Sequence, residues 1–164
     1  MEASGTGGCG RWSSLFRSPW TGTGARMVLA GVWCWAGWAK FLHPETSVYA
    51  VRAYRALPEG LVHPVGYGLP VLELALAVLL AAGVMTRFAA TLSALLLLAF
   101  LAAIIQAWAR GMSIDCGCFG GGGAVDPGQT RYAAEIIRDL AFLALSVLLI
   151  RRPRTRVSLD AVLP

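Results

Sequence analysis

The sequence predicts an all-α integral membrane protein, a bundle of four transmembrane helices with a short interfacial helix between the first two spans. Hydrophobic residues make up 57% of the 164 residues and charged residues only 14%, whereas ordinary soluble domains carry roughly 25% charged residues. Four apolar segments approach the length of about 20 residues that a spanning helix needs. The net charge is +5, but the arginines of the chain gather near its ends and form no basic stripe. This excludes a nucleic-acid partner and favours the lipid bilayer.

The four predicted spans cover residues 24–42, 65–85, 88–109 and 132–150. The third span carries no charged residue, whereas a helix of a soluble core shows a polar face at a period of 3.6 residues. We therefore favour membrane spans over buried soluble helices. The first span together with the preceding tail could instead be a signal peptide. However, Lys40-Phe41-Leu42-His43-Pro44 follows it in place of a cleavage site of small residues.

The connections between the spans also carry predictions. Thr86-Arg87 is expected to form a tight turn between the second and third spans. Between the first and second spans, apolar side chains recur at helical spacing at Val48, Val51, Tyr54 and Leu57. This spacing predicts a short helix lying at the membrane interface, and an ordinary solvated loop is the alternative.

The domain organisation is one membrane domain, residues 24–150, between a flexible tail of residues 1–23 and a basic tail of residues 151–164. Basic residues near the ends of spans predict the orientation. One side receives Arg11, Arg17, Arg26, Arg87, Arg151, Arg152, Arg154 and Arg156. The other side receives fewer, namely Lys40, Arg52, Arg55, Arg110 and Arg131. We therefore expect a multi-pass protein of the bacterial inner membrane with both termini in the cytoplasm.

The most unusual connection is the glycine-rich loop with Cys116 and Cys118, which this topology places on the outer, oxidising side. A disulfide across one residue closes a small, strained ring, and strain makes the bond easier to reduce. Gly117 supplies the backbone freedom for such a ring. A reversible dithiol is the first interpretation. The alternatives are a static bridge, two unreactive thiols, or a metal site completed by His43 and His63.

The remaining cysteines have simpler interpretations. Cys9 lies in the tail, and Cys34 lies within the first span, where it behaves as a small apolar residue. Within the loop, Asp115 precedes Cys116 and opposes thiolate formation there, because a nearby negative charge disfavours ionisation. Cys118 is therefore expected to be the more nucleophilic thiol.

Charged residues inside spans are costly and are candidates for function. Glu73 lies roughly 12 Å and Arg138 roughly 9 Å from the outer ends of their spans, at 1.5 Å per residue, and Lys40 lies near the outer end of the first. Glu135 and Asp139 flank Arg138 in sequence. These groups could hold a quinone-like head group, relay a proton or activate a thiol. The alternative is a structural ion pair that locks the helices together.

The segment Asp115-Cys116-Gly117-Cys118-Phe119-Gly120 resembles the signature of the MauE family, the methylamine-utilisation membrane proteins of the wider DoxX-like group. The resemblance covers about residues 27–150. Where the family often carries Arg-Asn, this chain has Arg138-Asp139. Further positions that fit the family pattern are Gly37 and Lys40, the stretch from Tyr54 to Pro58, Pro70 and Glu73, and Arg110-Gly111.

The resemblance implies a four-helix membrane protein linked to thiol–disulfide chemistry, in support of the maturation of extracytoplasmic proteins. Cys116 and Cys118 would be the catalytic pair, exchanging a disulfide with a separate thioredoxin-like protein. A quinone is the candidate membrane carrier. The alternative function is a non-catalytic scaffold with a static Cys-Gly-Cys bridge. The residues expected to support the pair are Lys40, Glu73, Asp115, Phe119 and Arg138.

Overall fold

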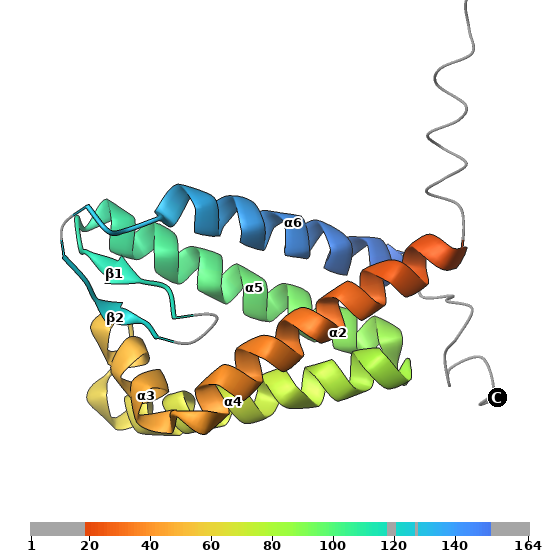
Figure 1. The fold of residues 1–164 in the computed structure, drawn as a ribbon, viewed down its shortest axis with the longest axis horizontal. Helices are drawn as coiled ribbons and strands as arrows, with labels where there is room; N and C mark the ends of the chain where they lie inside the picture. Colours follow the sequence, from red (N-terminus) through yellow and green to blue (C-terminus); the bar gives the residue numbers. More distant parts are fainter. Residues whose placement is uncertain (1–18, 118–120, 127, 152–164) are drawn as a thin grey trace, which may run out of the picture.

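The computed structural model describes residues 19–117, 121–126 and 128–151. This part of the chain is mainly helical, and two short antiparallel strands separate the last two helices (Figure 1). Residues 1–18 and 152–164, which make up most of the predicted tails 1–23 and 151–164, lie outside the described residues, as do Cys118 and Phe119. Cys9 falls in the first of these segments, whereas residues 19–23 and 151 are helical. The elements are α2 (Pro19–Leu42), α3 (Pro44–Ala53), α4 (Glu59–Ala82), α5 (Thr86–Ala109), β1 (Ile114–Asp115), β2 (Gly123–Ala124) and α6 (Tyr132–Arg151).

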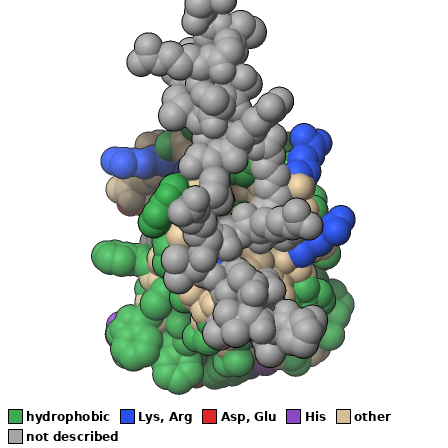
Figure 2. All heavy atoms as spheres, turned by 90° about the vertical axis from the view of Figure 1, so that its right-hand side faces the viewer, with side chains coloured by type: hydrophobic (Ala, Val, Ile, Leu, Met, Phe, Trp, Pro, Cys, Tyr) green, Lys and Arg blue, Asp and Glu red, His purple; other side chains and the backbone are tan. Residues whose placement is uncertain are grey.

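The long helices pack as two pairs, α2 against α4 and α5 against α6 (Figure 1). One end of the bundle holds the start of α2, the α4–α5 connection and the end of α6. The opposite end holds α3 and the two strands. Arg26, Arg87 and Arg151 therefore belong to the first end. Figure 2 looks onto this end, where Lys and Arg side chains stand at the edge among hydrophobic ones. This grouping agrees with the predicted sides of the bundle, while the orientation in a membrane stays a prediction.

Two of the described helices, α4 and α5, are long and apolar enough to cross a membrane. Only 33% and 39% of their most apolar stretches are buried, so most of these residues keep contact with the surroundings of the bundle, unlike those of a helix in a soluble core. By contrast, α2 is rich in glycine and contains Arg26 and Lys40, and α6 carries Glu135, Arg138 and Asp139. The structure thus supports the second and third predicted spans, and the crossing of a membrane by α2 and α6 stays a prediction.

The helix boundaries differ from the predicted spans for local reasons. Helix α2 begins at Pro19, a residue type common in first turns, and α4 begins at Glu59 and continues through Pro64. The expected turn at Thr86-Arg87 lies earlier, because Gly83 ends α4 in the left-handed conformation with φ 66°. Its N–H donates to the Leu79 carbonyl oxygen at 3.0 Å, an arrangement typical of glycine-terminated helices.

The short helix expected between the first two spans is present as α3, although it ends at Ala53, before Tyr54 and Leu57. It packs closely on α4. The Ser47 hydroxyl donates to the Gly66 carbonyl oxygen at 2.8 Å, and a Cβ atom added to Gly66 would lie 2.6 Å from Val48 Cγ2. Only glycine therefore allows the two helices to approach this closely.

A chain of buried polar groups crosses the core and joins three helices. The Trp33 indole Nε1–H of α2 donates to Ser93 Oγ of α5 at 2.8 Å. Ser93 Oγ in turn lies 3.1 Å from Ser146 Oγ of α6. Each buried group thus has a partner, as a dry interior requires. The surrounding apolar cluster is formed by Ala25, Leu29, Ala30, Leu76, Ala77, Leu80, Ala89, Ala90, Leu97 and Leu149.

Candidate functional site

The cysteine loop folds back on itself at two glycines. Cys116 follows β1, and Gly117 has φ +67°. Gly122 has φ +96°, and a Cβ atom added to it would lie 2.6 Å from Gly117 Cα. Both the positive φ values and the close backbone approach require glycine. The glycine-rich run of the sequence thus serves a tight crossing of the loop, not simple flexibility.

Helix α6 fixes the start of this loop. The Tyr132 hydroxyl donates to the Met112 carbonyl oxygen at 2.5 Å and accepts from the Ile114 N–H at 2.9 Å. One turn later, Glu135 Oε1 accepts from the Cys116 N–H at 3.5 Å. Tyr132 is not among the residues predicted for the site. Its position at the first turn after the loop is the signal that could have pointed to it.

The segment after α3 holds the loop from the other side. The Tyr54 hydroxyl donates to the Cys116 carbonyl oxygen at 3.5 Å. Burial raises the pKa of Tyr54 well above its usual value, and the nearby Glu135 carboxylate adds to this shift. Tyr54 therefore stays protonated and keeps its donor at any physiological pH.

The predicted charged residues form two separate pairs. Lys40 Nζ lies 2.5 Å from Glu73 Oε1, and the two side chains are 8% and 0% exposed. Arg138 Nε lies 3.1 Å from Asp139 Oδ1. Glu73 is therefore paired with Lys40 and not with Arg138. The first pair joins α2 to α4, whereas the second lies within α6.

Each of the three buried carboxylates keeps one oxygen without a hydrogen-bond partner among the described residues. These atoms are Glu73 Oε2, Glu135 Oε2 and Asp139 Oδ2. Buried acceptors are normally satisfied, so such atoms call for an explanation. They are suited to accept protons or a ligand's N–H or O–H group.

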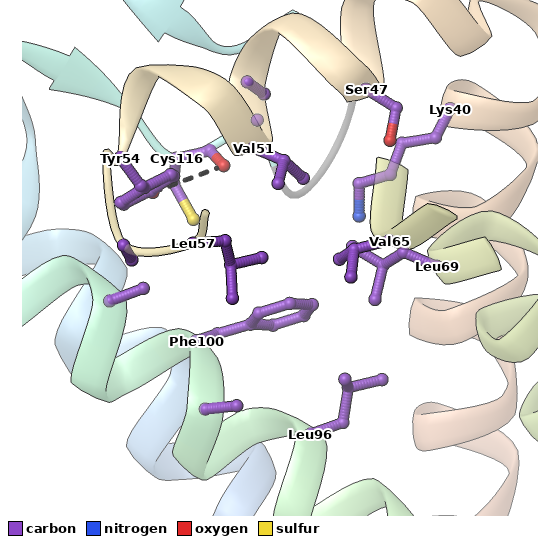
Figure 3. A pocket seen from close by; sticks show the side chains of 15 residues that line it. Lys40, Ser47, Val51, Tyr54, Leu57, Val65, Leu69, Leu96, Phe100 and Cys116 are labelled. Atoms are coloured by element: carbon purple, nitrogen blue, oxygen red, sulfur yellow. Dashed lines mark hydrogen bonds between the residues drawn. The ribbon is translucent and has the colours of Figure 1, made fainter. Parts of the chain in front are cut away.

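A cavity of about 280 Å³ lies between the cysteine loop, α3, α4 and α5. Figure 3 shows the Lys40 ammonium and the Cys116 sulfur pointing into it, with the Phe100 ring along one wall. Lys40 Nζ lies 5.5 Å from the centre of this ring. The lining residues are Lys40, Ser47, Ala50, Val51, Tyr54, Ala56, Leu57, Val65, Leu69, Leu96, Ala99, Phe100, Ala103, Cys116 and Gly117.

The structure describes part of the predicted cysteine chemistry. Cys116 is disulfide-bonded, and Cys34 is free and exposed on α2. Cys118 lies outside the described residues, so the pairing of Cys116 with Cys118 and its redox activity stay predictions. Within residues 19–117, 121–126 and 128–151, no three His, Cys, Asp or Glu side chains gather as a metal ion would need.

The fold and the site define a helical protein with two candidate membrane spans and a cysteine loop that borders the same cavity as the buried Lys40 ammonium. The chain belongs to the MauE family, because the family model described as methylamine utilisation protein MauE matches residues 18–152. The predicted resemblance is thereby confirmed.

A curated relative, the methylamine utilization protein MauE of Paracoccus denitrificans, is 40% identical over 98 residues. This alignment covers 59% of the present chain and 53% of the relative, so it spans about half of that protein's length. No solved structure matches the chain.

Proposed function

We propose that the chain is a thiol–disulfide redox protein of the bacterial inner membrane. In this proposal Cys116 and Cys118 exchange a disulfide with a thioredoxin-like protein outside the cytoplasm and pass electrons to or from a membrane carrier. The observation that carries the proposal is the setting of Cys116. Its backbone is held by Tyr54 and Glu135, while its sulfur faces an apolar cavity that also contains the Lys40 ammonium.

The exchange proceeds in two balanced steps. A thiolate of the partner attacks one sulfur of the Cys116–Cys118 disulfide, breaking that bond and forming a mixed disulfide. The second thiol of the partner then displaces this chain's sulfur, so the partner leaves as a disulfide and this chain holds two thiols. Two electrons and two protons have moved to this chain. The reverse sequence reduces the partner.

The charges near Cys116 support different roles for the two cysteines. Asp115 precedes Cys116 in the chain, and Glu135 Oε1 lies 3.5 Å from the Cys116 backbone nitrogen. A negative charge next to a cysteine disfavours its thiolate, and Asp115 is the sequence neighbour that would act in this way on Cys116. We accordingly assign Cys118 as the nucleophile that meets the partner and Cys116 as the thiol that resolves the mixed disulfide.

The family and the candidate spans support a role beside the membrane. The relative from Paracoccus denitrificans carries methylamine utilisation in its name. We propose that this chain assists the maturation of extracytoplasmic proteins, as in a methylamine-utilising system. Phe119 and the Arg138–Asp139 pair would support the loop that meets the partner.

Mixed-disulfide capture tests the proposal. Cys116→Ser removes the thiol that would resolve a mixed disulfide on Cys118. The full-length variant in intact cells should therefore trap a thioredoxin-like protein in a reducible complex. The matched control is Cys34→Ser, which removes a thiol elsewhere and should trap nothing above wild type. If no complex forms, and the redox state of the pair in membranes never changes on adding a reductant or a quinone, the chain is a scaffold with a static bridge.

A further inference from the structure

The cavity beside Cys116 has few polar groups, and most of them are engaged within the protein. The Ser47 hydroxyl donates to the Gly66 carbonyl oxygen at 2.8 Å, and the Tyr54 hydroxyl donates to the Cys116 carbonyl oxygen. Lys40 differs from both. Its ammonium has three N–H donors, and among the described residues one acceptor, Glu73 Oε1, lies within hydrogen-bond distance. Further donors of a nearly buried ammonium therefore face the cavity (Figure 3).

We propose that this cavity binds the ring of a lipid-soluble quinone, with the Lys40 ammonium donating to a ring carbonyl oxygen. The proposal deepens the proposed function and rests on it for the electron transfer, since a quinone that accepts two electrons and two protons from two thiols becomes a hydroquinone. The binding itself follows from the shape, the charge and the position of the cavity.

The charge of the site favours a neutral acceptor over an anion. Glu73 already balances the Lys40 charge at 2.5 Å, so a carboxylate or phosphate ligand would add an uncompensated negative charge in a dry environment. A hydrocarbon chain would leave the donors of Lys40 unsatisfied, which is costly in a buried site. A quinone carbonyl oxygen accepts the hydrogen bond and brings no charge.

The walls and the position of the cavity fit an apolar ring. Phe100 offers a ring face, and Leu57 stands opposite the Lys40 ammonium in the same space (Figure 3). The volume of about 280 Å³ lies just below the range for small-molecule sites, about 300–1,000 Å³, which suits a single ring. Val65 and Leu69 come from α4, and Phe100 comes from α5, the two helices able to cross a membrane.

Photolabelling of the full-length protein in membranes with an azido-quinone tests the proposal. Ala103 of α5 lines the cavity, whereas its neighbour Ala102 is exposed and lies outside the lining. Ala103→Phe fills the cavity and should lower labelling at least tenfold, while Ala102→Phe should stay within twofold of wild type. The same comparison from α4 uses Leu69→Trp against the exposed Val71→Trp. Equal labelling of the filled and control variants would overturn the proposal.

The donor is tested by removing both charges together, because loss of one alone leaves the other buried and unpaired. Lys40→Met combined with Glu73→Leu should weaken competition by unlabelled quinone about tenfold or more, the effect of one hydrogen bond from a charged donor. It should leave competition by the matching ring without carbonyl oxygens unchanged. If alkanes or phospholipid compete as well as quinone in wild type, the cavity is a lipid site and the proposal is wrong.

These experiments separate the two proposals. Labelling requires no thiol, and capture of a mixed disulfide requires no quinone. If the protein traps a partner but binds no quinone, the proposed function stands and the quinone site is wrong. If the protein binds quinone in this cavity but its cysteines never change redox state, the quinone site stands and the proposed redox function is wrong.

Discussion

The ion pair between Lys40 and Glu73 combines complete burial with opposite charges from two helices. Both side chains are almost fully removed from solvent. A buried pair contributes little relative to well-packed apolar residues, but the loss of one partner is severe because the other charge stays uncompensated. The pair therefore fixes the register of α2 against α4 more than it adds to stability.

Glu73→Gln should lower the free energy of unfolding by about 3–5 kcal/mol, because it leaves the Lys40 ammonium buried without its counter-charge. Thermal or denaturant unfolding in detergent micelles measures the effect. The double variant Glu73→Gln and Lys40→Met should lose less than the losses of the two single variants added together, because the sites are coupled. Glu73→Gln combined with Arg138→Met should be additive. If the losses in unfolding free energy at Glu73 and Lys40 were additive as well, the ion pair between them would be contradicted.

The close approach of Gly122 to Gly117 leads to a prediction about access to Cys116. Gly122 and Gly128 have nearly the same φ, +96° and +97°, but an added Cβ atom meets Gly117 only at Gly122. Gly122→Ala should therefore expose Cys116 to alkylating reagents after reduction much more than Gly128→Ala does. Both variants carry the strain of positive φ, so the difference between them isolates the contact. Equal alkylation rates would show that the crossing does not position Cys116.

At the scale of the elements, small residues decide how closely the helices meet. Gly66 lies where α3 crosses α4, while Gly68 of the same helix has nothing within 4 Å of an added Cβ atom. Gly66→Ala should destabilise the protein by about 1–3 kcal/mol, the cost of overpacking. Gly68→Ala should be neutral or stabilise it by up to about 1 kcal/mol, because alanine favours a helix. The two unfolding curves test this difference, and a loss of equal size in both variants would contradict it.

The sequence predicted the elements better than it predicted their ends and contacts. Apolar runs and their periodicity located α4, α5, α6 and α3, since those signals are local. The start of α4 was missed because Pro64 reads as a breaker, although a proline near the start of a helix loses few hydrogen bonds. The turn before α5 was misplaced because the left-handed cap at Gly83 is a weaker signal than a charged residue.

Some residues of the candidate site could likewise be predicted from the sequence, and others could not. Glu73 and Lys40 were identifiable because charges in apolar segments are conspicuous. The contacts of Tyr54 and Tyr132 with the cysteine loop were not, although Tyr54 fits the family pattern, because these hydrogen bonds reach a loop segment whose position relative to each tyrosine depends on the fold. Such contacts arise from the tertiary arrangement and have no local pattern.

For the whole molecule, the distribution of basic residues predicts the orientation. Arg87 and Arg151 lie at one end of the bundle, and the cysteine loop lies at the other. If the basic end faces the cytoplasm, a membrane-impermeant thiol reagent added to intact, reduced cells should label Cys116 or Cys118 and not Cys9. Variants that retain one cysteine each identify the labelled residue. Labelling of Cys9 alone would invert the orientation and place the loop among reduced cytosolic thiols.

The buried pair between α2 and α4 also bears on the order in which the chain enters a bilayer. A lone charge at the centre of a spanning helix costs about 2.5–3.5 kcal/mol on insertion scales. Glu73 lies well inside α4 and meets its counter-charge only when the Lys40 end of α2 packs beside it. If α2 crosses the bilayer as predicted, the two helices therefore insert together. The Trp33–Ser93–Ser146 chain can form only after α6 has been synthesised. If all four long helices span the bilayer as predicted, α2 and α4 form one insertion unit, and its packing on α5 and α6 is the last step of assembly.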